Sequence, residues 1–447
     1  MSKPKVCKVA VLGLGHVGLP LAALLAVNGI PVQGFDISSN AIARIKKGKV
    51  NFQEPGLNEI LKRALKSGAL TVSTAETDLK QSDVFIVTVG TPWNETRETP
   101  DLSQLESALK VVAKQMEKGA TIVLKSTVSP GTSDRFAIPM LARISSLRPI
   151  DDFGVVFSPE RMIEGRAVKD LQTLPKIIGA TDDDSFDVAS KVLKVLGGTI
   201  QRVSNLRTAE MAKMLDNYNR DGSIALINQF ALFCEAANVD VLEVIQSVKL
   251  GYERNAGILI PGGGVGGSCL NKDPWLLNHF AKEKGIENDL ISTIRSRNSS
   301  MPLETVRLVK IIASRLKLQK PKILVAGLAF KSDTDDTRFS PAITIAKTLL
   351  EEGSRITLSD PEVKSLAEYG IFESVTPDIY AAAKGRDIVI FAADHSEYKK
   401  IDLVRLRKLM GKRAGIVDSR HVVEPRIAIA LGFDFEGIGR PRGAFTS

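Results

Sequence analysis

The sequence predicts an α/β protein in which a long central helical segment joins two doubly wound domains with parallel sheets. Short apolar, β-branched runs alternate with helical stretches in residues 1–203 and again in residues 306–447, as in parallel sheets covered by helices. Between them the hydrophobic periodicity stays helical from about Ser204 to Val248. At 447 residues the chain is also too long for one hydrophobic core. We therefore expect domains at 1–203, 204–305 and 306–447.

The composition excludes several classes of protein. The 60 basic and 51 acidic residues give a net charge of +9, but they are dispersed, so the charge fits a small phosphorylated ligand better than nucleic acid. No window approaches the roughly 18 uninterrupted apolar residues of a membrane helix. Three cysteines and the absence of a signal-peptide pattern favour the cytoplasm. The four histidines are far apart and no Cys/His pair has zinc spacing, so we predict no metal.

The first elements predict a strand at 8–12, a glycine turn, a helix at 19–28 and a strand at 31–35 that ends at Asp36. Glycines at 13, 15 and 18 permit a tight turn, close approach of a pyrophosphate and close helix packing. A carboxylate after the second strand can accept both ribose hydroxyls of NAD and would repel the 2′-phosphate of NADP. The pattern is therefore Rossmann-like, and a glycine turn without ligand is the alternative. The turn residues predicted to bind the cofactor are Gly13, Gly15, His16, Val17 and Gly18, with His16 as a spacer.

Further strands are expected at 84–89, 121–125, 154–157 and 176–178. Polar turns follow the first three of them, at 90–92, 126–132 and 158–161. Ligands of doubly wound sheets bind beyond the carboxyl ends of the strands, so these turns should line one cleft. The candidate site residues in them are Thr91, Thr127, Glu160 and Arg161.

The central helical segment places Lys213 and Asn217 four residues apart, on one helix face. The pair either faces the cleft or belongs to a solvated polar stripe. A long helix that links two α/β units commonly supplies a dimer interface as well, so we expect a homodimer.

The stretch 261–273 contains Cys269 after a run in which six of eight residues are glycine or proline. Such a backbone can approach a ligand closely. We expect the thiol to lie on this loop, where Lys272 would favour the thiolate and hence covalent catalysis. The alternative is a flexible hinge that carries an inert cysteine.

After Pro321 the alternation resumes with a strand at 322–327, a loop, a helix near 342–352 and a strand that ends at Asp360, followed by strands at 387–391 and 415–417. This repeats the order of the first domain without its glycine fingerprint. We interpret it as a second Rossmann-like domain that binds something other than a standard dinucleotide. Lys331 and Arg338 flank a loop suited to phosphate or carboxylate, although such residues are often only solvated.

Together these motifs resemble the UDP-glucose/GDP-mannose dehydrogenase family, the nucleotide-sugar 6-dehydrogenases, over nearly the whole chain. The motifs that carry the resemblance lie at 13–19, 126–132, 158–161, 210–217, 262–273, 327–331 and 336–338. The resemblance implies NAD as cofactor, a UDP-binding C-terminal domain and a four-electron oxidation at C6 of the sugar. In that reaction Cys269 would form a thiohemiacetal and then a thioester, which water hydrolyses.

The resemblance also implies the roles of other residues. Lys213 would stabilise the oxyanion and Asn217 would orient it, while Asp273 would assist proton transfer. Glu160 would position or activate the hydrolytic water, and Thr127 would hydrogen-bond near the nicotinamide. Arg254 would contact the substrate from its own or the partner subunit. The substrate contacts implied in all are Glu160, Arg161, Lys213, Asn217, Arg220, Arg254, Gly266, Lys331 and Arg338. Cys7 and Cys234 are interpreted as structural.

The subfamily features are mixed. Residues 159–161, the Gly264–Gly267 run and the Asn217-x-x-Arg220-Asp221 helix look like the N-acetylhexosamine branch. Ser268, where that branch usually has His, is closer to the UDP-glucose enzymes, and so is Glu164-Gly165. We favour UDP-N-acetylmannosamine over its glucosamine epimer, with UDP-glucose as runner-up and UDP versus GDP left open.

Two other functions remain as alternatives. A two-electron β-hydroxyacid dehydrogenase could use the first domain and the Lys213/Asn217 pair, but it needs neither Cys269 nor a third domain. A catalytically silent NAD-binding regulator need not keep Lys213, Asn217, Cys269 and Asp273 together.

Overall fold

The computed structural model describes residues 7–50 and 52–446 and divides into two compact units. The first comprises the chain up to Asp216 with Trp275–Glu287, and the second comprises Asn217–Pro274 with Asn288 to the end. Helices α8 (Leu206–Ala237) and α10 (Ser268–Glu283) each have residues in both units. A separate central domain at 204–305 therefore stays a prediction.

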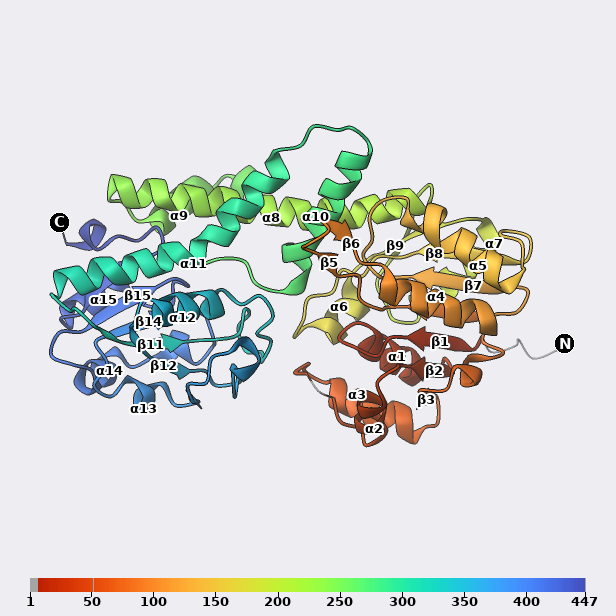
Figure 1. Cartoon of the computed structure of the whole chain (residues 1–447), viewed down its shortest axis with the longest axis horizontal. Helices are drawn as coiled ribbons and strands as arrows, with labels where there is room; N and C mark the ends of the chain where they lie inside the picture. Colours follow the sequence, from red (N-terminus) through yellow and green to blue (C-terminus); the bar gives the residue numbers. More distant parts are fainter. Residues whose placement is uncertain (1–6, 51, 447) are drawn as a thin grey trace. The chain divides into compact units, whose positions relative to one another are not determined.

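The first unit contains an eight-stranded sheet among the described residues, in the order β10-β9-β8-β7-β4-β1-β2-β3 (Figure 1). Its first six strands in sequence thus lie in the Rossmann order 3-2-1-4-5-6. The strands are β1 (Val9–Leu12), β2 (Val32–Phe35), β3 (Leu70–Ser73), β4 (Val84–Val87), β7 (Ala120–Leu124), β8 (Phe153–Phe157), β9 (Lys176–Ala180) and β10 (Ile200–Arg202). β9 pairs antiparallel with β8, a direction that a hydrophobic run alone does not specify. β5 (Trp93–Asn94) and β6 (Thr99–Pro100) form a separate hairpin.

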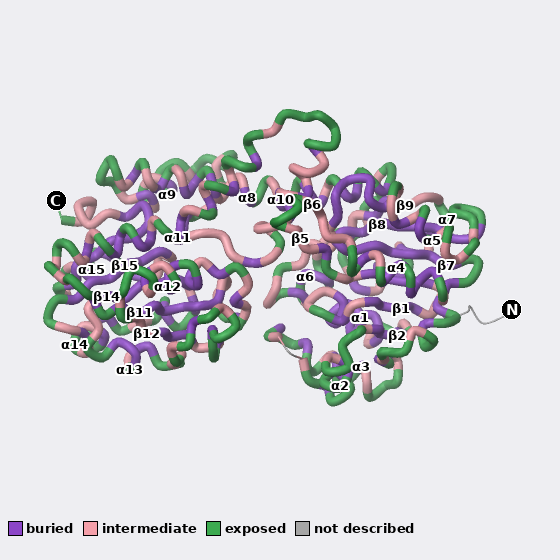
Figure 2. Tube along the Cα trace, in the orientation of Figure 1, coloured by how far each residue is buried: buried purple, intermediate pink, exposed green. Residues whose placement is uncertain are grey.

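Both faces of this sheet are buried, which explains the continuous apolar runs of its central strands (Figure 2). Val9 and Val11 of β1 pack into one core cluster, while Ala10 and Leu12 pack into the other. α1 (Gly18–Val27), α3 (Leu57–Lys66) and α7 (Asp183–Lys194) contribute to the first cluster, whereas α4 (Ser103–Gln115) and α5 (Ile138–Ser145) contribute to the second. The first unit also contains α2 (Ser39–Lys46) and α6 (Ala167–Thr173).

The second unit contains a six-stranded, wholly parallel sheet in the order β13-β12-β11-β14-β15-β16, again 3-2-1-4-5-6. Its strands are β11 (Lys322–Ala326), β12 (Arg355–Ser359), β13 (Val375–Thr376), β14 (Ile388–Phe391), β15 (Gly415–Asp418) and β16 (Asp434–Gly437). The predicted fold class, two Rossmann-like units linked by a long helix, is confirmed.

Helices cover both faces of the second sheet as well. The remaining helices are α9 (Val241–Lys249), α11 (Leu290–Arg315), α12 (Pro341–Glu351), α13 (Ile379–Ala383), α14 (Leu403–Leu409) and α15 (Pro425–Ala430). Ile323 and Val325 of β11 pack with α11 and α12, and Leu324 and Ala326 pack with α13 and α14. No single helix in the described ranges has the length and hydropathy to span a membrane; α8 and α9 meet that test only as a pair bent by 118°.

Candidate functional site

The glycine turn after β1 has the geometry that its spacing predicts. Gly13 adopts φ +90°, which favours glycine. A Cβ on Gly18 would lie 1.8 Å from the Gly13 carbonyl oxygen, whereas a Cβ on Gly15 would meet nothing within 4 Å. Gly18 therefore lets α1 pack closely against the turn, and Gly15 leaves open space beside it. Val17, at the N-cap of α1, offers no side chain to the first-turn amides. Such amides can donate hydrogen bonds to a phosphate.

Asp36 lies beside this turn at the end of β2. Its Oδ2 accepts a hydrogen bond from the Leu14 amide at 2.8 Å, and its Oδ1 accepts one from the Ser38 amide at 2.9 Å. The side chain is partly exposed, so lone pairs of the carboxylate stay accessible for ribose hydroxyls. The open glycine turn and this acid fit the adenosine half of NAD.

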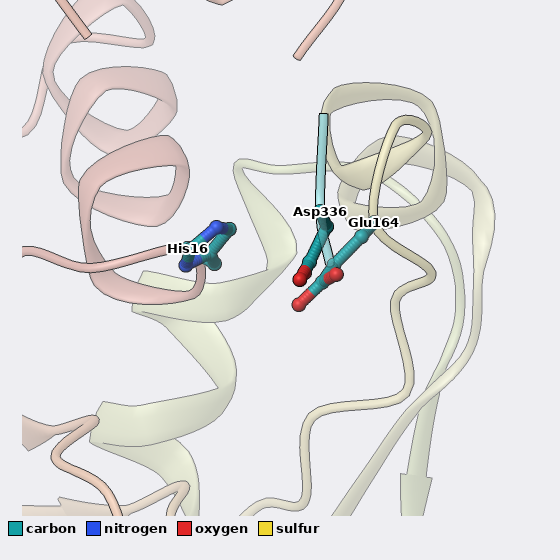
Figure 3. Close-up of side chains that lie close together, drawn as sticks. All are labelled: His16, Glu164 and Asp336. Atoms are coloured by element: carbon teal, nitrogen blue, oxygen red, sulfur yellow. The ribbon is translucent and has the colours of Figure 1, made fainter. Parts of the chain in front are cut away.

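His16 projects from the glycine turn (Figure 3) and stacks on Phe52, with ring centroids 4.1 Å apart. The same view labels Glu164, which also belongs to the first unit, and Asp336, which is described with the second unit. The stacking gives His16 a packing contact that the sequence did not predict, and its place in the cofactor site stays a prediction.

The polar turns after β4 and β7 are joined by hydrogen bonds. Thr91 donates from Oγ1 to the Thr127 carbonyl, and Ser126 donates from Oγ to the Val89 carbonyl at 2.7 Å. The structure thus brings Thr91 and Thr127 together at the carboxyl edge of the first sheet, as the alternation of strands and polar turns predicts.

Glu160, in the turn after β8, forms a nearly buried ion pair with Lys125. The Lys125 Nζ lies 3.2 Å from Oε2 of Glu160 and also donates to the Ser158 carbonyl, and its side chain is 3% exposed. The amides of Arg161 and Met162 donate to Oε1. Burial opposes ionisation of Glu160, but the Lys125 ammonium and these amides outweigh burial and lower the pKa of Glu160. Sequence reasoning missed Lys125; its only signal was a lysine directly after a buried strand.

Glu210 fixes the start of α8 to the turn that follows β7. This fully buried carboxylate accepts hydrogen bonds from the amides of Gly131 and Ser133 and from the Ser133 hydroxyl at 2.7 Å. Burial raises the pKa of Glu210 although these hydrogen bonds oppose the rise. Lys213 follows one turn later on α8 and is buried. Because Glu210 anchors the start of this helix, it helps to position Lys213.

Cys269 lies in the first turn of α10, so its predicted place on a loop is wrong. The glycine run ends at Gly267, which has φ +81°, and Ser268 begins the helix. The thiol is exposed, whereas Cys234 is buried and its burial raises the pKa of the Cys234 thiol. Exposed amides and a partial positive charge at a helix N-terminus favour a thiolate. The glycine run and the helix start together form the turn that presents Cys269.

Asn217 and Asp273 are brought together inside the second unit. Asn217 donates from Nδ2 to Oδ2 of Asp273, and Lys272 pairs with Oδ1 of the same carboxylate. Asp273 is 1% exposed and Asn217 is 9% exposed, which excludes the solvated polar stripe for Asn217. Lys272 contacts the carboxylate of Asp273, and its effect on the thiol stays a prediction.

The loop at 328–338 packs against the glycine run. The Gly267 amide donates to the Arg338 carbonyl at 2.9 Å, and a Cβ on Gly266 would lie 2.2 Å from the Cβ of Phe330. Gly266 therefore allows contact with this loop. The guanidinium of Arg338 pairs with Asp336 of its own loop. The cysteine turn and the predicted phosphate-binding loop thus form one surface of the second unit.

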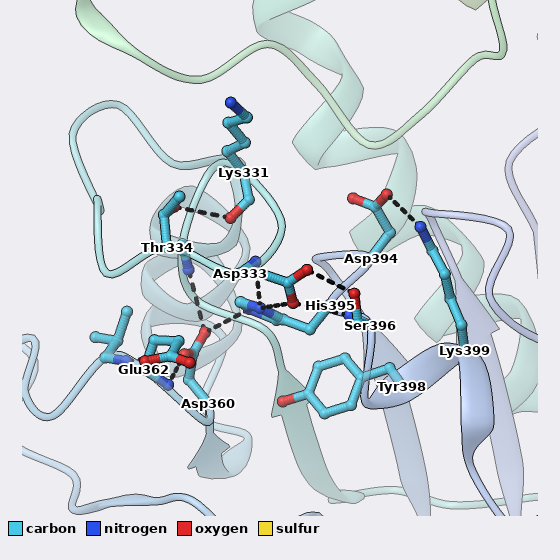
Figure 4. A network of polar contacts seen from close by, with 12 residues as sticks. Lys331, Asp333, Thr334, Asp360, Glu362, Asp394, His395, Ser396, Tyr398 and Lys399 are labelled. Carbon is cyan, nitrogen blue, oxygen red and sulfur yellow. Dashed lines mark hydrogen bonds and ion pairs between the residues drawn. The ribbon is translucent and has the colours of Figure 1, made fainter. Parts of the chain in front are cut away.

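A buried Asp360–His395 contact holds this loop from beneath (Figure 4). Oδ2 of Asp360 accepts hydrogen bonds from the amides of Leu328 and Ala329, and His395 Nε2 lies 3.1 Å from the same oxygen. The Asp333 amide donates to His395 Nδ1, which assigns the ring proton to Nε2. Burial opposes ionisation, but the hydrogen bonds lower the pKa of Asp360. The side chain of Lys331 extends away from this network (Figure 4).

Three predicted contacts lie on more open surface. Arg161 pairs with Asp216 at 3.4 Å, Arg220 is exposed on α8, and Arg254 is exposed in the turn at Glu253–Asn255. Their roles toward a substrate stay predictions.

Three family models match the chain. The NAD binding domain of the UDP-glucose/GDP-mannose dehydrogenase family matches residues 7–196, its central domain matches residues 207–300 and its UDP binding domain matches residues 324–425.

Individual relatives match over nearly their whole length. The UDP-N-acetyl-D-mannosamine dehydrogenase of Pyrococcus horikoshii is 36% identical over 436 residues, with 97% of this chain and 99% of that protein covered. The solved structure of UDP-D-ManNAc dehydrogenase from Pyrococcus horikoshii gives a TM-score of 0.89 at 35% identity, with 97% and 100% covered. A UDP-glucose dehydrogenase from Pyrobaculum islandicum gives a TM-score of 0.85 at 28% identity, with 98% and 99% covered.

Proposed function

The chain belongs to the UDP-glucose/GDP-mannose dehydrogenase family, and we propose that it oxidises the C6 alcohol of UDP-N-acetyl-D-mannosamine to the uronate. It is an NAD-dependent nucleotide-sugar dehydrogenase. NAD⁺ supplies the hydride acceptor in both oxidation steps. The observation that carries the proposal is the hydrogen bond from Gly267 to Arg338, which joins the turn that presents Cys269 to the loop at 328–338. One ligand could thus span from that loop to the thiol.

In the proposed reaction Cys269 attacks the C6 aldehyde left by the first oxidation. A C–S bond forms and the carbonyl oxygen takes a proton, which gives a thiohemiacetal. The second oxidation converts that adduct to a thioester. Water then adds to the thioester carbon, the C–S bond breaks, and the uronate and the free thiol are released. Over the cycle one sugar loses four electrons.

The other side chains have the roles that the resemblance to the family implies. Lys213 stabilises negative charge on the reacting oxygen, and Asn217 orients that oxygen. Asp273 exchanges a proton with the alcohol or with water, and its buried hydrogen bond from Asn217 supports a fixed orientation. Glu160 holds the hydrolytic water as a hydrogen-bond acceptor, and Thr127 donates near the nicotinamide.

Substrate choice rests on likeness. Relatives named as acting on UDP-N-acetylmannosamine support the N-acetylated sugar. The second candidate is UDP-glucose, which Ser268 directly before the cysteine favours and for which a related structure is named. A diphosphate would be held by Lys331 and Arg338, whose cations suit phosphate oxygens.

The test measures NADH production with UDP-N-acetylmannosamine, UDP-N-acetylglucosamine, UDP-glucose and GDP-mannose separately. Two NADH per molecule of UDP-N-acetylmannosamine consumed is the expected result. Cys269→Ser should bind NAD⁺ normally and form no uronate, because only the covalent step needs sulfur. Uronate formation at the normal rate by Cys269→Ser would refute the thioester mechanism.

A homodimer is part of the proposal. Leu226, Phe230 and Phe233 lie at spacings of four and three on α8 and are 74%, 40% and 58% exposed, so they form one apolar stripe on the second unit. Such a stripe suits a second copy of this chain. Sedimentation of the purified protein should give twice the chain mass of 48.4 kDa, and a monomer at micromolar concentration would contradict it.

A further inference from the structure

A connected chain of buried polar side chains lies beneath the turn that presents Cys269, within the second unit. Arg295 of α11 is 4% exposed, and its two terminal nitrogens point to different partners. Nη1 donates to Oδ1 of Asp221 on α8 at 2.8 Å, and Nη2 donates to Oδ1 of Asn271 in α10 at 2.5 Å. One guanidinium therefore ties α8 and α11 to the helix turn that follows Cys269.

Asn271 passes this restraint to the glycine run. Its Nδ2 donates to the carbonyls of Val265 and Gly267, at 3.2 and 2.7 Å. It thus closes the backbone between the glycines and the helix start at Ser268. The Asn271 side chain cannot rotate without breaking its hydrogen bond to Arg295. The guanidinium therefore fixes the orientation of the Asn271 amide and, through it, the conformation of the turn.

The other end of the glycine run is held by the same network. Asn298 donates from Nδ2 to Asp221, and Asn228 donates from Nδ2 to Oδ1 of Asn298 at 3.1 Å. Asn228 in turn accepts a hydrogen bond from the Gly262 amide at 2.9 Å. Asp221 and Asn228 are fully buried, and Asn298 is 1% exposed. Both ends of the glycine run therefore connect to one polar core.

Glycine-rich backbone has no intrinsic preference for one conformation, so an ordered turn there needs restraints from outside. Removing a charged pair from water is costly, and apolar packing between α8 and α11 would be at least as stable. A network that reaches Gly262 at one end and Asn271 at the other restrains the segment whose geometry sets the position of the thiol. Nucleophilic attack is sensitive to errors of about 1 Å in that position.

We propose that Arg295 and Asn271 are positioning residues, which act through the glycine run and the first turn of α10 to hold Cys269 in its attacking geometry. This inference rests on the proposed function, in which Cys269 is the nucleophile. Arg295 and Asn271 need not contact the substrate.

The experiment compares Asn271→Ala and Arg295→Lys with the wild type and with Arg297→Lys as matched control. Asn271→Ala removes the bonds to the turn and leaves the Arg295–Asp221 pair in place. Arg295→Lys keeps a charge beside Asp221, but one ammonium cannot reproduce the fork that reaches both partners. Arg297 lies on the same helix and donates to Ser300 of that helix, outside the network.

Three readouts separate positioning from a general loss of structure. The first is the rate at which iodoacetamide alkylates Cys269 across pH 6–9, followed by mass spectrometry of its peptide. The second is kcat against KM for the sugar nucleotide, and the third is NAD⁺ affinity by calorimetry. In both network variants we expect kcat to fall by roughly one to two orders of magnitude and the pH profile of alkylation to change, while NAD⁺ affinity and KM stay within about twofold. Arg297→Lys should match the wild type.

Wild-type kcat and a wild-type alkylation profile in folded Asn271→Ala would overturn the inference. Cys269→Ser separates this failure from failure of the proposed function. If Cys269→Ser is inactive while both network variants are normal, the nucleophile is right and the positioning role is wrong. If Cys269→Ser turns over fully, the thioester mechanism of the proposed function is wrong.

Discussion

Replacing Lys125 with methionine should destabilise the first unit more than replacing an exposed lysine does. In the wild type the Lys125 Nζ lies 3.2 Å from Oε2 of Glu160, and the two side chains are 3% and 14% exposed. Lys125→Met keeps most of the volume of the side chain and leaves a nearly buried carboxylate without its cation. The expected loss of stability comes from the unpaired buried charge of that carboxylate and not from a cavity.

The structure sets the magnitude. Removal of one partner from a buried ion pair typically costs about 3–5 kcal/mol. Glu160 keeps the two amides of Arg161 and Met162 on Oε1, and the charge of Lys176 also acts on it. We therefore expect the lower end of the range, about 3 kcal/mol at neutral pH.

The penalty should depend on pH in a definite direction. In the folded wild type the pKa of Glu160 is lowered, because the Lys125 ammonium and the amides outweigh burial. Its contribution is thus present above the unfolded pKa of about 4.3 and is lost as pH falls through the folded pKa. Without Lys125, the largest of the influences that lower the pKa of Glu160 is lost, so its pKa rises from the wild-type value and protonation relieves the variant first. The difference between variant and wild type should shrink from pH 7.5 toward pH 4.5.

Urea unfolding followed by tryptophan fluorescence measures this difference. The two tryptophans of the chain, Trp93 and Trp275, both belong to the first unit and stack with centroids 6.4 Å apart. The control is Lys110→Met, which removes a pair with Glu106 whose side chains are 49% and 42% exposed and should cost about 0.5 kcal/mol. The reasoning would be refuted if Lys125→Met lowered the free energy of unfolding no more than Lys110→Met does. It would also be refuted if the Lys125→Met loss were the same at pH 7.5 and pH 4.5.

Two further predictions concern the cofactor turn. Gly18→Ala should lower the unfolding temperature of the protein without NAD, because the new Cβ would lie 1.8 Å from the Gly13 carbonyl oxygen and overpacking costs about 1–3 kcal/mol. Gly15→Ala should leave the unfolding temperature unchanged, because its Cβ would meet nothing within 4 Å. Equal effects of the two variants in thermal unfolding would contradict this. Asp36→Ala should reduce the ratio of kcat/KM for NAD⁺ to that for NADP⁺, because the carboxylate that repels a 2′-phosphate is removed, and an unchanged ratio would exclude Asp36 from the ribose site.

Much of the fold could be predicted from local patterns. The glycine fingerprint specifies the first Rossmann-like unit. The acid at the end of the second strand and the alternation of apolar runs with helices specify both units, because each signal acts within about 30 residues. The short edge strands β3, β10, β13 and β16 were not predicted. Their pairing depends on neighbours far along the chain, which no local pattern shows.

Candidate site residues could be proposed from the sequence where a residue type or a family motif points to chemistry. Cys269 is an example of the first kind, and Lys213 with Asn217 is an example of the second. Lys125 and Arg295 were missed because a buried cation looks like any other basic residue until its acidic partner is known. Their partners lie 35 and 74 positions away along the chain, a separation that no local pattern spans.

Asp36 and Asp360 each follow the second strand of their unit. The difference between their surroundings explains why the same strand order can bind two kinds of ligand. A carboxylate offers about four lone-pair sites. Asp360 is 1% exposed, and it accepts from four backbone amides, at residues 328, 329, 362 and 363, and from His395. Asp36 accepts from the amides of Leu14 and Ser38 and stays partly exposed. Topology therefore places an acid beside both turns, but only Asp36 has capacity left for ribose hydroxyls. A ligand of the second unit must therefore be held by groups other than that acid, and Lys331 and Arg338 are the residues predicted to hold it.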